Sequence, residues 1–228
     1  MDMTALPLFP LATVLFPGLA IPIHVFEPRY RALVADCTAG DWHFGIVAIA
    51  RGVEVGAPAE PYRVGTLARI VRLERLPDGR ANLLALGLAR IRLTALEREG
   101  KPYLRGTAAI WPDEEEGPPP DEALETRTGE LFLRYRQLML EPGGEVEPDA
   151  TAAADQPLPT GPRGLAAMVG ALLQVPVADR QQLLEAPTLA ERLRRAEALL
   201  TREIALMEAT HAAPGRNPAE LRGVFSDN

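Results

Sequence analysis

The chain has 228 residues, of which 47% are hydrophobic and 24% charged, so it is a globular chain long enough to bury a substantial core. Its net charge of -7 argues against a polyphosphate partner, because duplex binding relies on clustered lysine and arginine. A single cysteine, Cys37, excludes an intramolecular disulfide and a cysteine-based metal cluster.

The segment LPLFPLATVLFPGLAIPIHVFEPRY, residues 6–30, interrupts strand-forming residues with prolines every few positions. Pro7 and Pro10 are expected to bracket a short first strand. The Phe-Pro-Gly sequence that ends at Gly18 predicts a turn in which glycine supplies the permissive backbone. The proline spacing therefore indicates an architectural role for this segment.

Residues 21–26 carry the alternating pattern of a strand, with Ile21, Ile23 and Val25 on one face. Pro22 confines this strand to a sheet edge or a bulge, since proline cannot donate to a ladder on both sides.

A helix is predicted next. Pro28 suits its first turn, where the missing N–H costs nothing, and Gly40 suits its end. An apolar stripe at positions i, i+3, i+4 and i+7 would face the core. Its members are Tyr30, Leu33, Val34 and Cys37.

More strands are expected at residues 43–50, 62–76, 80–96 and 102–112. The second and third of these flank Pro77-Asp78-Gly79, a good hairpin signal. With the strands before the helix, the N-terminal half holds about six strands and one helix, an arrangement typical of a small barrel.

The second half changes character at residue 113. Residues 113–120, DEEEGPPP, read as an acidic and proline-rich linker, and residues 142–162 as a flexible loop. Between and after them, apolar stripes at helical spacing predict four helices. The first ends near residue 141, the second spans 165–173, and the third lies around 178–186. The fourth begins at Thr188, where Glu191 completes a capping box. The stripe residues are Leu124, Leu131, Phe132, Tyr135, Leu138, Met139, Leu165, Met168, Val169, Leu172, Leu173, Leu189, Leu193, Ala196 and Leu200.

The sequence thus predicts an α+β fold. Residues 1–112 form the barrel subdomain, 113–120 the linker, 121–210 a helical subdomain, and 211–228 a loose tail.

Several segments in order resemble the N-terminal substrate-binding domain of Lon proteases. They are the stretch that begins LPLFPLATVLFPG, then FGIVAI, GVEVG, VGTLARI, DGRANLLALGLARIRL, and LLQVPVADRQQLLEAPTLAERLRRAEALLTRE. The resemblance covers about residues 5–208. It implies a PUA-like barrel followed by helices, a fold found at the front of Lon, in cereblon, and in small stand-alone bacterial proteins. This chain looks like the stand-alone kind.

The residues predict no enzyme. The only lysine, Lys101, precedes a proline, so no phosphate-binding P-loop exists, and the only serine, Ser226, lies in the tail, which argues against a Ser-Lys dyad. The histidines show no metal-ligand spacing. The sequence therefore predicts no catalytic residue, no metal and no cofactor.

The resemblance implies a receptor for unfolded or exposed apolar polypeptide, one that could work with a separate protease. The candidate surface is the proline-rich opening stretch, in which rigid backbone would hold aromatic side chains for docking with little entropy loss. Its residues are Phe16, Pro22, Phe26, Glu27, Arg29 and Tyr30. The alternative interpretation is that these aromatics fill one end of the barrel. A second candidate is a groove between barrel and helices, crossed by the linker.

The alternative function is RNA or small-ligand binding through the barrel, since PUA-like barrels also bind RNA. It would need the strand arginines to share one face, although the overall charge disfavours nucleic acid. These are Arg63, Arg69, Arg72, Arg75, Arg90 and Arg92.

The N-terminus lacks the basic and apolar regions of a signal peptide, and no apolar run approaches the roughly 20 residues of a membrane span. Together with the single cysteine, these features predict a bacterial cytoplasmic protein without a membrane partner.

Overall fold

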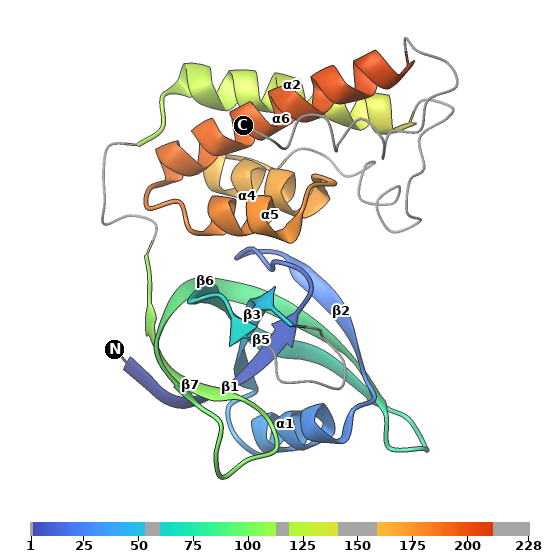
Figure 1. Cartoon of the computed structure of the whole chain (residues 1–228), viewed down its shortest axis with the longest axis vertical. Helices are drawn as coiled ribbons and strands as arrows, with labels where there is room; N and C mark the ends of the chain where they lie inside the picture. The colour runs from blue at the N-terminus through green and yellow to red at the C-terminus, as the bar shows by residue number, and fades with distance from the viewer. Residues whose placement is uncertain (1, 53–59, 113–118, 141–158, 212–228) are drawn as a thin grey trace. The chain divides into compact units, whose positions relative to one another are not determined.

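The computed structural model describes residues 2–52, 60–112, 119–140 and 159–211 (Figure 1). The chain divides into two compact units. The barrel unit comprises Met1–Glu116 and Gln174–Thr188, and the helical unit comprises Gly117–Leu173 and Leu189–Asn228. Residues 174–188, which were expected within the helical subdomain, are part of the compact unit that contains the barrel.

The described part of the barrel unit contains seven strands in one sheet, against the expected six or so. They are β1 (Asp2–Leu11), β2 (Ala20–Val25), β3 (His43–Arg51), β4 (Glu60–Pro61), β5 (Val64–Arg75), β6 (Ala81–Glu97) and β7 (Arg105–Ile110). The order is β1-β7-β6-β5-β3-β4, and parallel pairing of β1 with β3 closes the ring. The strand β2 pairs with β6 outside this path.

The first strand is longer than predicted, because β1 runs through both Pro7 and Pro10 instead of lying between them. Its N-terminal half pairs antiparallel with β7 up to Pro7, and its C-terminal half pairs parallel with β3 from Leu8. Each half pairs on one side only, so a proline ring nitrogen can face the side without a partner. A change of pairing partner, invisible in the sequence, explains the wrong boundary.

Both predicted turns are confirmed. Gly18 has φ 86°, and the Leu19 N–H donates to the Phe16 carbonyl at 3.2 Å, which closes the proline-glycine turn. Gly79 has φ 81° between β5 and β6, which pair antiparallel along their lengths. These positive φ values are available to glycine at little cost.

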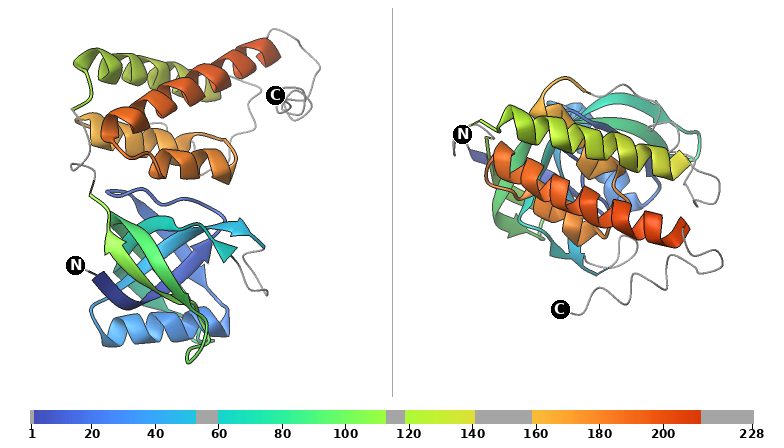
Figure 2. Two further views of the ribbon diagram at one scale, coloured as in Figure 1. Left: turned by 60° about the vertical axis from the view of Figure 1, so that its left-hand side comes forward. Right: turned by 90° about the horizontal axis from the view of Figure 1, so that it is seen from above.

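The helix α1 (Pro28–Ala39) confirms the predicted start at Pro28 and end before Gly40. It lies across one end of the barrel, as the side view in Figure 2 shows. The predicted stripe is the buried face of α1, and it packs into a core with side chains from β1, β2, β3, β5 and β6. Phe44, for example, is fully buried in that core.

The segment 174–188 is fixed to the barrel by hydrogen bonds from buried polar side chains. It contains the helix α5 (Val177–Leu184). Arg90 of β6 donates to the carbonyls of Leu184 at 3.0 Å and Ala186 at 2.6 Å, and Gln181 Nε2 donates to the Val64 carbonyl at 2.9 Å. These bonds are why α5 belongs to the barrel unit.

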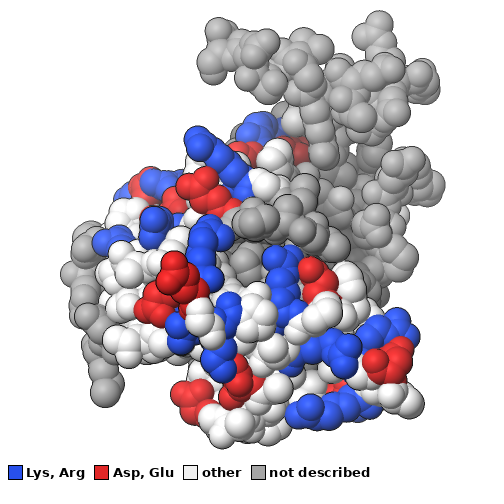
Figure 3. All heavy atoms as spheres, turned by 60° about the horizontal axis from the view of Figure 1, so that its bottom comes forward, with Lys and Arg blue, Asp and Glu red and all other residues white. Residues whose placement is uncertain are grey.

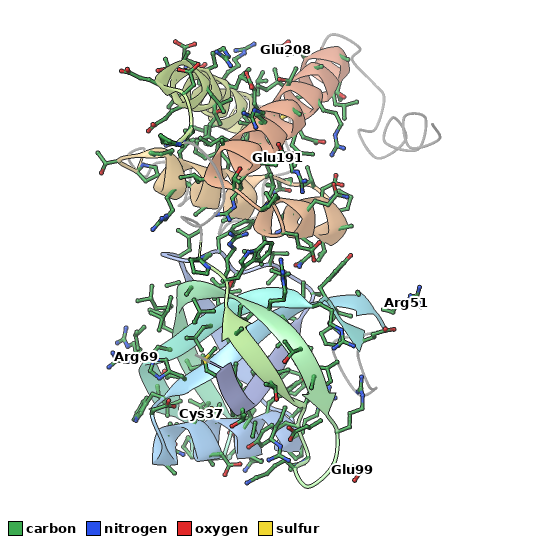
Figure 4. All side chains as sticks on the ribbon, turned by 90° about the vertical axis from the view of Figure 1, so that its left-hand side faces the viewer. Cys37, Arg51, Arg69, Glu99, Glu191 and Glu208 are labelled. Atoms are coloured by element: carbon green, nitrogen blue, oxygen red, sulfur yellow. The ribbon has the colours of Figure 1, made fainter. Side chains whose placement is uncertain are left out.

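The helical unit contains α2 (Glu122–Leu140), α4 (Pro162–Leu172) and α6 (Leu189–His211). Most of the predicted stripe residues are buried, among them Phe132, Leu138 and Leu193. Two ion pairs join α2 to α6: Arg127 with Glu197 at 3.0 Å and Arg134 with Glu208 at 2.7 Å. Figure 4 labels Glu208 on α6. Because these pairs are partly exposed, each contributes at most about 1 kcal/mol, and the apolar stripes dominate stability.

The predicted loop at 142–162 and the predicted tail at 211–228 fall largely outside the described residues, as does most of the linker at 113–120. Within the described ranges no helix has both the length and the hydropathy needed to cross a bilayer.

Gly129 lies inside α2, and a Cβ there would have its nearest neighbour, Leu165 Cδ2, at 3.9 Å, an ordinary contact. Glycine in a helix interior costs about 1 kcal/mol relative to alanine. The Gly129→Ala variant is therefore expected to stabilise the helical unit by about 1 kcal/mol. Urea unfolding followed by far-UV circular dichroism measures this change, and a lower midpoint would contradict it.

Candidate functional site

A pocket of about 200 Å³ opens in the barrel unit beside β2. Its lining comes from β1 and the residues after it, from β2, from the segment that leads into α1, and from the first turn of α1. The lining residues are Phe9, Leu11, Thr13, Ile21, Pro22, Ile23, His24, Phe26, Glu27 and Tyr30. The site is thus built almost entirely from the proline-rich opening stretch of the chain.

The pocket follows an edge of β2 and not one of its faces. Four consecutive residues, 21 to 24, line it, and consecutive side chains of a strand point to opposite faces. Lining by both odd and even positions agrees with a space along the side of β2 where no strand of the described residues pairs with it.

Stacked aromatic rings form part of the pocket wall. The Phe9 and Tyr30 rings are stacked, with centroids 4.1 Å apart and planes inclined by 16°, and both side chains are buried. The Arg29 guanidinium lies 4.5 Å from the Tyr30 ring centroid. Such stacking and cation–π contacts hold the rings in one orientation, so the pocket is preformed.

The rim of the pocket carries an exposed aromatic side chain. Phe26 is 47% exposed, and its ring lies 6.0 Å from the ring of His24. His24 Nδ1 lies 2.7 Å from Asn82 Oδ1, and the Asn82 amide donates to Glu74 at 3.4 Å. This chain of polar contacts orients His24 and leaves Phe26 as an apolar surface next to the pocket.

The charge of Glu27 is balanced locally. Its carboxylate lies 3.0 Å from Arg29 Nε, and both side chains are largely buried. A charged side chain that entered the pocket would therefore lose water and meet mainly aromatic and aliphatic groups, which is unfavourable without a partner. The pocket suits an uncharged, apolar group.

The structure brings together four of the six residues proposed from the sequence. Pro22, Phe26, Glu27 and Tyr30 line the pocket, and Arg29 supports it from behind Tyr30. Phe16 does not line this pocket, and its side chain is fully buried.

The other lining residues were not predicted from the sequence; they are Phe9, Leu11, Thr13, Ile21, Ile23 and His24. The period-2 pattern of residues 21–26 marked the strand but not which edge of it stays open. Phe9, Leu11 and Thr13 come from β1 and the residues after it, and β1 does not pair with β2.

The arginines proposed as a basic patch do not form one surface. Arg90 is 1% exposed and binds carbonyls of the barrel unit, so it cannot contact nucleic acid. Arg92 lies over the Trp111 ring at 4.0 Å. Arg69 projects outward (Figure 4), and on the face drawn in Figure 3 acidic groups lie among the basic ones. RNA binding is therefore not favoured.

Cys37 lies where α1 meets the barrel (Figure 4), and its Sγ–H donates to the His43 carbonyl at 3.4 Å. Burial, followed by the nearby Asp41 and Asp36 carboxylates, raises the pKa of the Cys37 thiol to about 12. Asp36 itself accepts hydrogen bonds from Lys101, at 2.7 Å, and from Tyr103, which tie α1 to the segment before β7. Cys37 is a structural thiol.

Cys37 in the folded protein is expected to react with a thiol-specific disulfide reagent at pH 8 on the order of 1,000-fold more slowly than in denaturant, because little thiolate exists at that pH. The ratio of the two labelling rates is measured by quenching the reaction of the single cysteine at successive times, with and without guanidinium chloride. Rates within tenfold of each other would contradict the structural assignment.

Comparison with known proteins identifies the family. The family model described as the ATP-dependent protease La (LON) substrate-binding domain matches residues 5–202. The chain therefore belongs to the Lon substrate-binding domain family, as its sequence motifs predicted, and its α+β fold is that of this family.

Individual relatives agree. The chain is 30% identical over 210 residues to a Lon protease of Anaeromyxobacter dehalogenans and 31% identical over 210 residues to Lon protease 2 of Myxococcus xanthus, and each match covers 90% of this chain. It spans 24% of the length of each of these relatives. The crystal structure of a Lon N-terminal domain protein from Xanthomonas campestris matches with a TM-score of 0.61 and 26% identity, covering 86% of this chain and 98% of that one.

The N-terminal domain of a Mycobacterium avium complex Lon protease shares the fold, with a TM-score of 0.61 at 20% identity. The chain thus matches the family's substrate-binding domain over residues 5–202.

Proposed function

We propose that this chain is a non-enzymatic receptor that captures exposed apolar segments of unfolded polypeptides in the pocket beside β2. The observation that carries the proposal is the pocket itself: it is preformed, lined mainly by aromatic and aliphatic residues together with Thr13, His24 and Glu27, and bordered by the exposed ring of Phe26. Rigid aromatic side chains can bind apolar groups with little loss of conformational entropy.

The family description supports the same function. A substrate-binding domain of an ATP-dependent protease has polypeptides as its substrates, and this chain belongs to that family. Among the described residues no group of three or more His, Cys, Asp or Glu side chains is placed to hold a metal ion. Binding is proposed to need neither ATP nor metal, and the bound polypeptide could then pass to a separate protease. The proposed groove beside the linker at 113–120 remains a prediction, since most of that linker lies outside the described residues.

A binding measurement tests the proposal. Fluorescein-labelled short peptides that scan a reduced, carboxymethylated polypeptide are titrated with the protein in the absence of ATP, and anisotropy is recorded. We expect saturable binding of the peptides that contain large apolar residues. Absence of saturable binding by any peptide would refute the function.

The Phe26→Ala variant is expected to weaken this binding by about tenfold, because it removes an exposed ring from the pocket rim. Val71→Ala is the matched control, since Val71 is an apolar barrel residue of similar exposure, 49%, outside the pocket. Equal affinities of the two variants would place the binding surface elsewhere.

A further inference from the structure

The strand β2 has one paired edge and one open edge. It pairs antiparallel with β6 from Ala20 opposite Leu86 to Val25 opposite Ala81. No other strand in the described residues pairs with β2. The pocket lies along this strand, so the open edge and the pocket form one continuous feature.

The pairing register shows which backbone groups face the open edge. The Gly87 N–H donates to the Leu19 carbonyl at 2.8 Å, which makes the next pair, Ala20 with Leu86, a non-hydrogen-bonded pair of the ladder. Hydrogen-bonded and non-hydrogen-bonded pairs alternate, so Pro22 and His24 also belong to non-hydrogen-bonded pairs. The position of Pro22 agrees, because a proline has no N–H to give to β6.

The backbone groups of Ala20, Pro22 and His24 therefore point away from β6. They present the N–H groups of Ala20 and His24 and the carbonyl groups of all three residues. Backbone groups of this kind are strong hydrogen-bonding groups, and an edge that carries them is a template for another strand.

The pocket beside this edge has the size of one large side chain. An apolar cavity of about 150 Å³ holds a benzene ring, and this pocket has about 200 Å³. Its stacked Phe9 and Tyr30 rings and its balanced Glu27 favour an uncharged ring or a branched aliphatic group.

We infer that the open edge of β2 takes an extended segment of a partner polypeptide as an added strand, with one large apolar side chain of that segment in the pocket. This inference rests on the proposed function and specifies how the polypeptide is held. Main-chain hydrogen bonds to β2 supply affinity for any sequence, and the pocket supplies the preference for an apolar residue.

Pro22 argues for an unrelated polypeptide over a second copy of this chain as the occupant. Proline removes one donor from the middle of the edge, so two β2 edges paired with each other would lack donors on both strands. A partner segment without proline lacks only the one hydrogen bond that the N–H of residue 22 would have donated. Edge prolines of this kind are a common protection against self-association.

The test uses the apolar peptide that binds the full chain most tightly, synthesised in versions with a single N-methyl group at each successive position. We expect the N-methyl group to lower affinity by tenfold or more at every second residue of the peptide, where the N–H faces β2. At the alternate residues, whose N–H groups point away from β2, we expect affinity to change less than threefold. Binding of the unmodified peptide without this alternation would overturn the added strand and leave the proposed function standing. Failure of the unmodified peptide to bind would remove both.

A pair of variants tests the protein side. His24→Pro removes the N–H at the open edge without removing a hydrogen bond to β6, whereas His24→Ala keeps that N–H and loses the same side chain. We expect His24→Pro to bind at least tenfold more weakly than His24→Ala, with both variants retaining native tryptophan fluorescence. Equal affinity would overturn the inference. It would also be overturned if the protein sedimented as a dimer that His24→Pro alone dissociates, which would assign the edge to a second copy.

Discussion

Replacing Arg90 with alanine is expected to destabilise the barrel unit by roughly 3–5 kcal/mol, because each buried carbonyl left without a donor costs about 1–3 kcal/mol. Arg90 is buried, donates to the carbonyls of Leu184 and Ala186 at the C-terminal end of α5, and lies 4.1 Å from the Trp111 ring. A cation at a helix C-terminus also interacts favourably with the helix dipole.

Trp42 and Trp111 are the only tryptophans of the chain, and both lie in the barrel unit, so tryptophan fluorescence during urea unfolding reports on that unit. Arg92→Ala is the control, because Arg92 lies 4.0 Å from the centroid of the same Trp111 ring but is exposed. We expect the control to cost less than about 1 kcal/mol. Similar losses in the two variants would show that ring contacts, and not the buried carbonyl contacts, account for the effect of Arg90.

The Gly65→Ala variant is expected to destabilise the barrel unit by about 2–3 kcal/mol, the cost of overpacking a close contact. A Cβ at residue 65 would lie 2.5 Å from the Ile46 carbonyl oxygen and 2.7 Å from Val47 Cγ1. The carbonyl belongs to the backbone of the neighbouring strand β3, so the ladder between β3 and β5 would have to shift to accept one methyl group.

The same chemical change at Gly129 is the matched control, since it meets only an ordinary contact in α2 and should raise stability. Tryptophan fluorescence follows the first variant and far-UV circular dichroism the second. An unchanged urea midpoint for Gly65→Ala would mean that β3 and β5 do not approach as closely as the structure has them.

Local signals in the sequence were sufficient for elements whose geometry depends on neighbours along the chain. Pro28 and Gly40 bounded α1 correctly, because a missing N–H is tolerated in the first turn and a glycine ends a helix readily. Gly79 between two apolar runs predicted the β5–β6 hairpin, because a tight hairpin turn needs a residue that tolerates positive φ. The motifs of the opening stretch were specific enough to indicate the family.

Features that depend on pairing between distant segments were beyond the sequence. The extent of β1 depends on its exchange of β7 for β3, and the burial of Arg90 depends on the return of residues 174–188 to the barrel. An arginine on a strand usually lies on the solvated face, so nothing local distinguished Arg90 from Arg69.

The sequence by itself determined the α+β class and confined Pro22 to a sheet edge or a bulge, because period and proline chemistry act locally. Its motifs, taken in order, indicated by resemblance the Lon substrate-binding domain family. Only the tertiary structure decided that this edge stays open beside a pocket, that Phe9 and Tyr30 stack in its wall, and that Phe16 is removed from it. Those facts arise from strand order and core packing, which join residues far apart in the chain and leave no periodic trace in it.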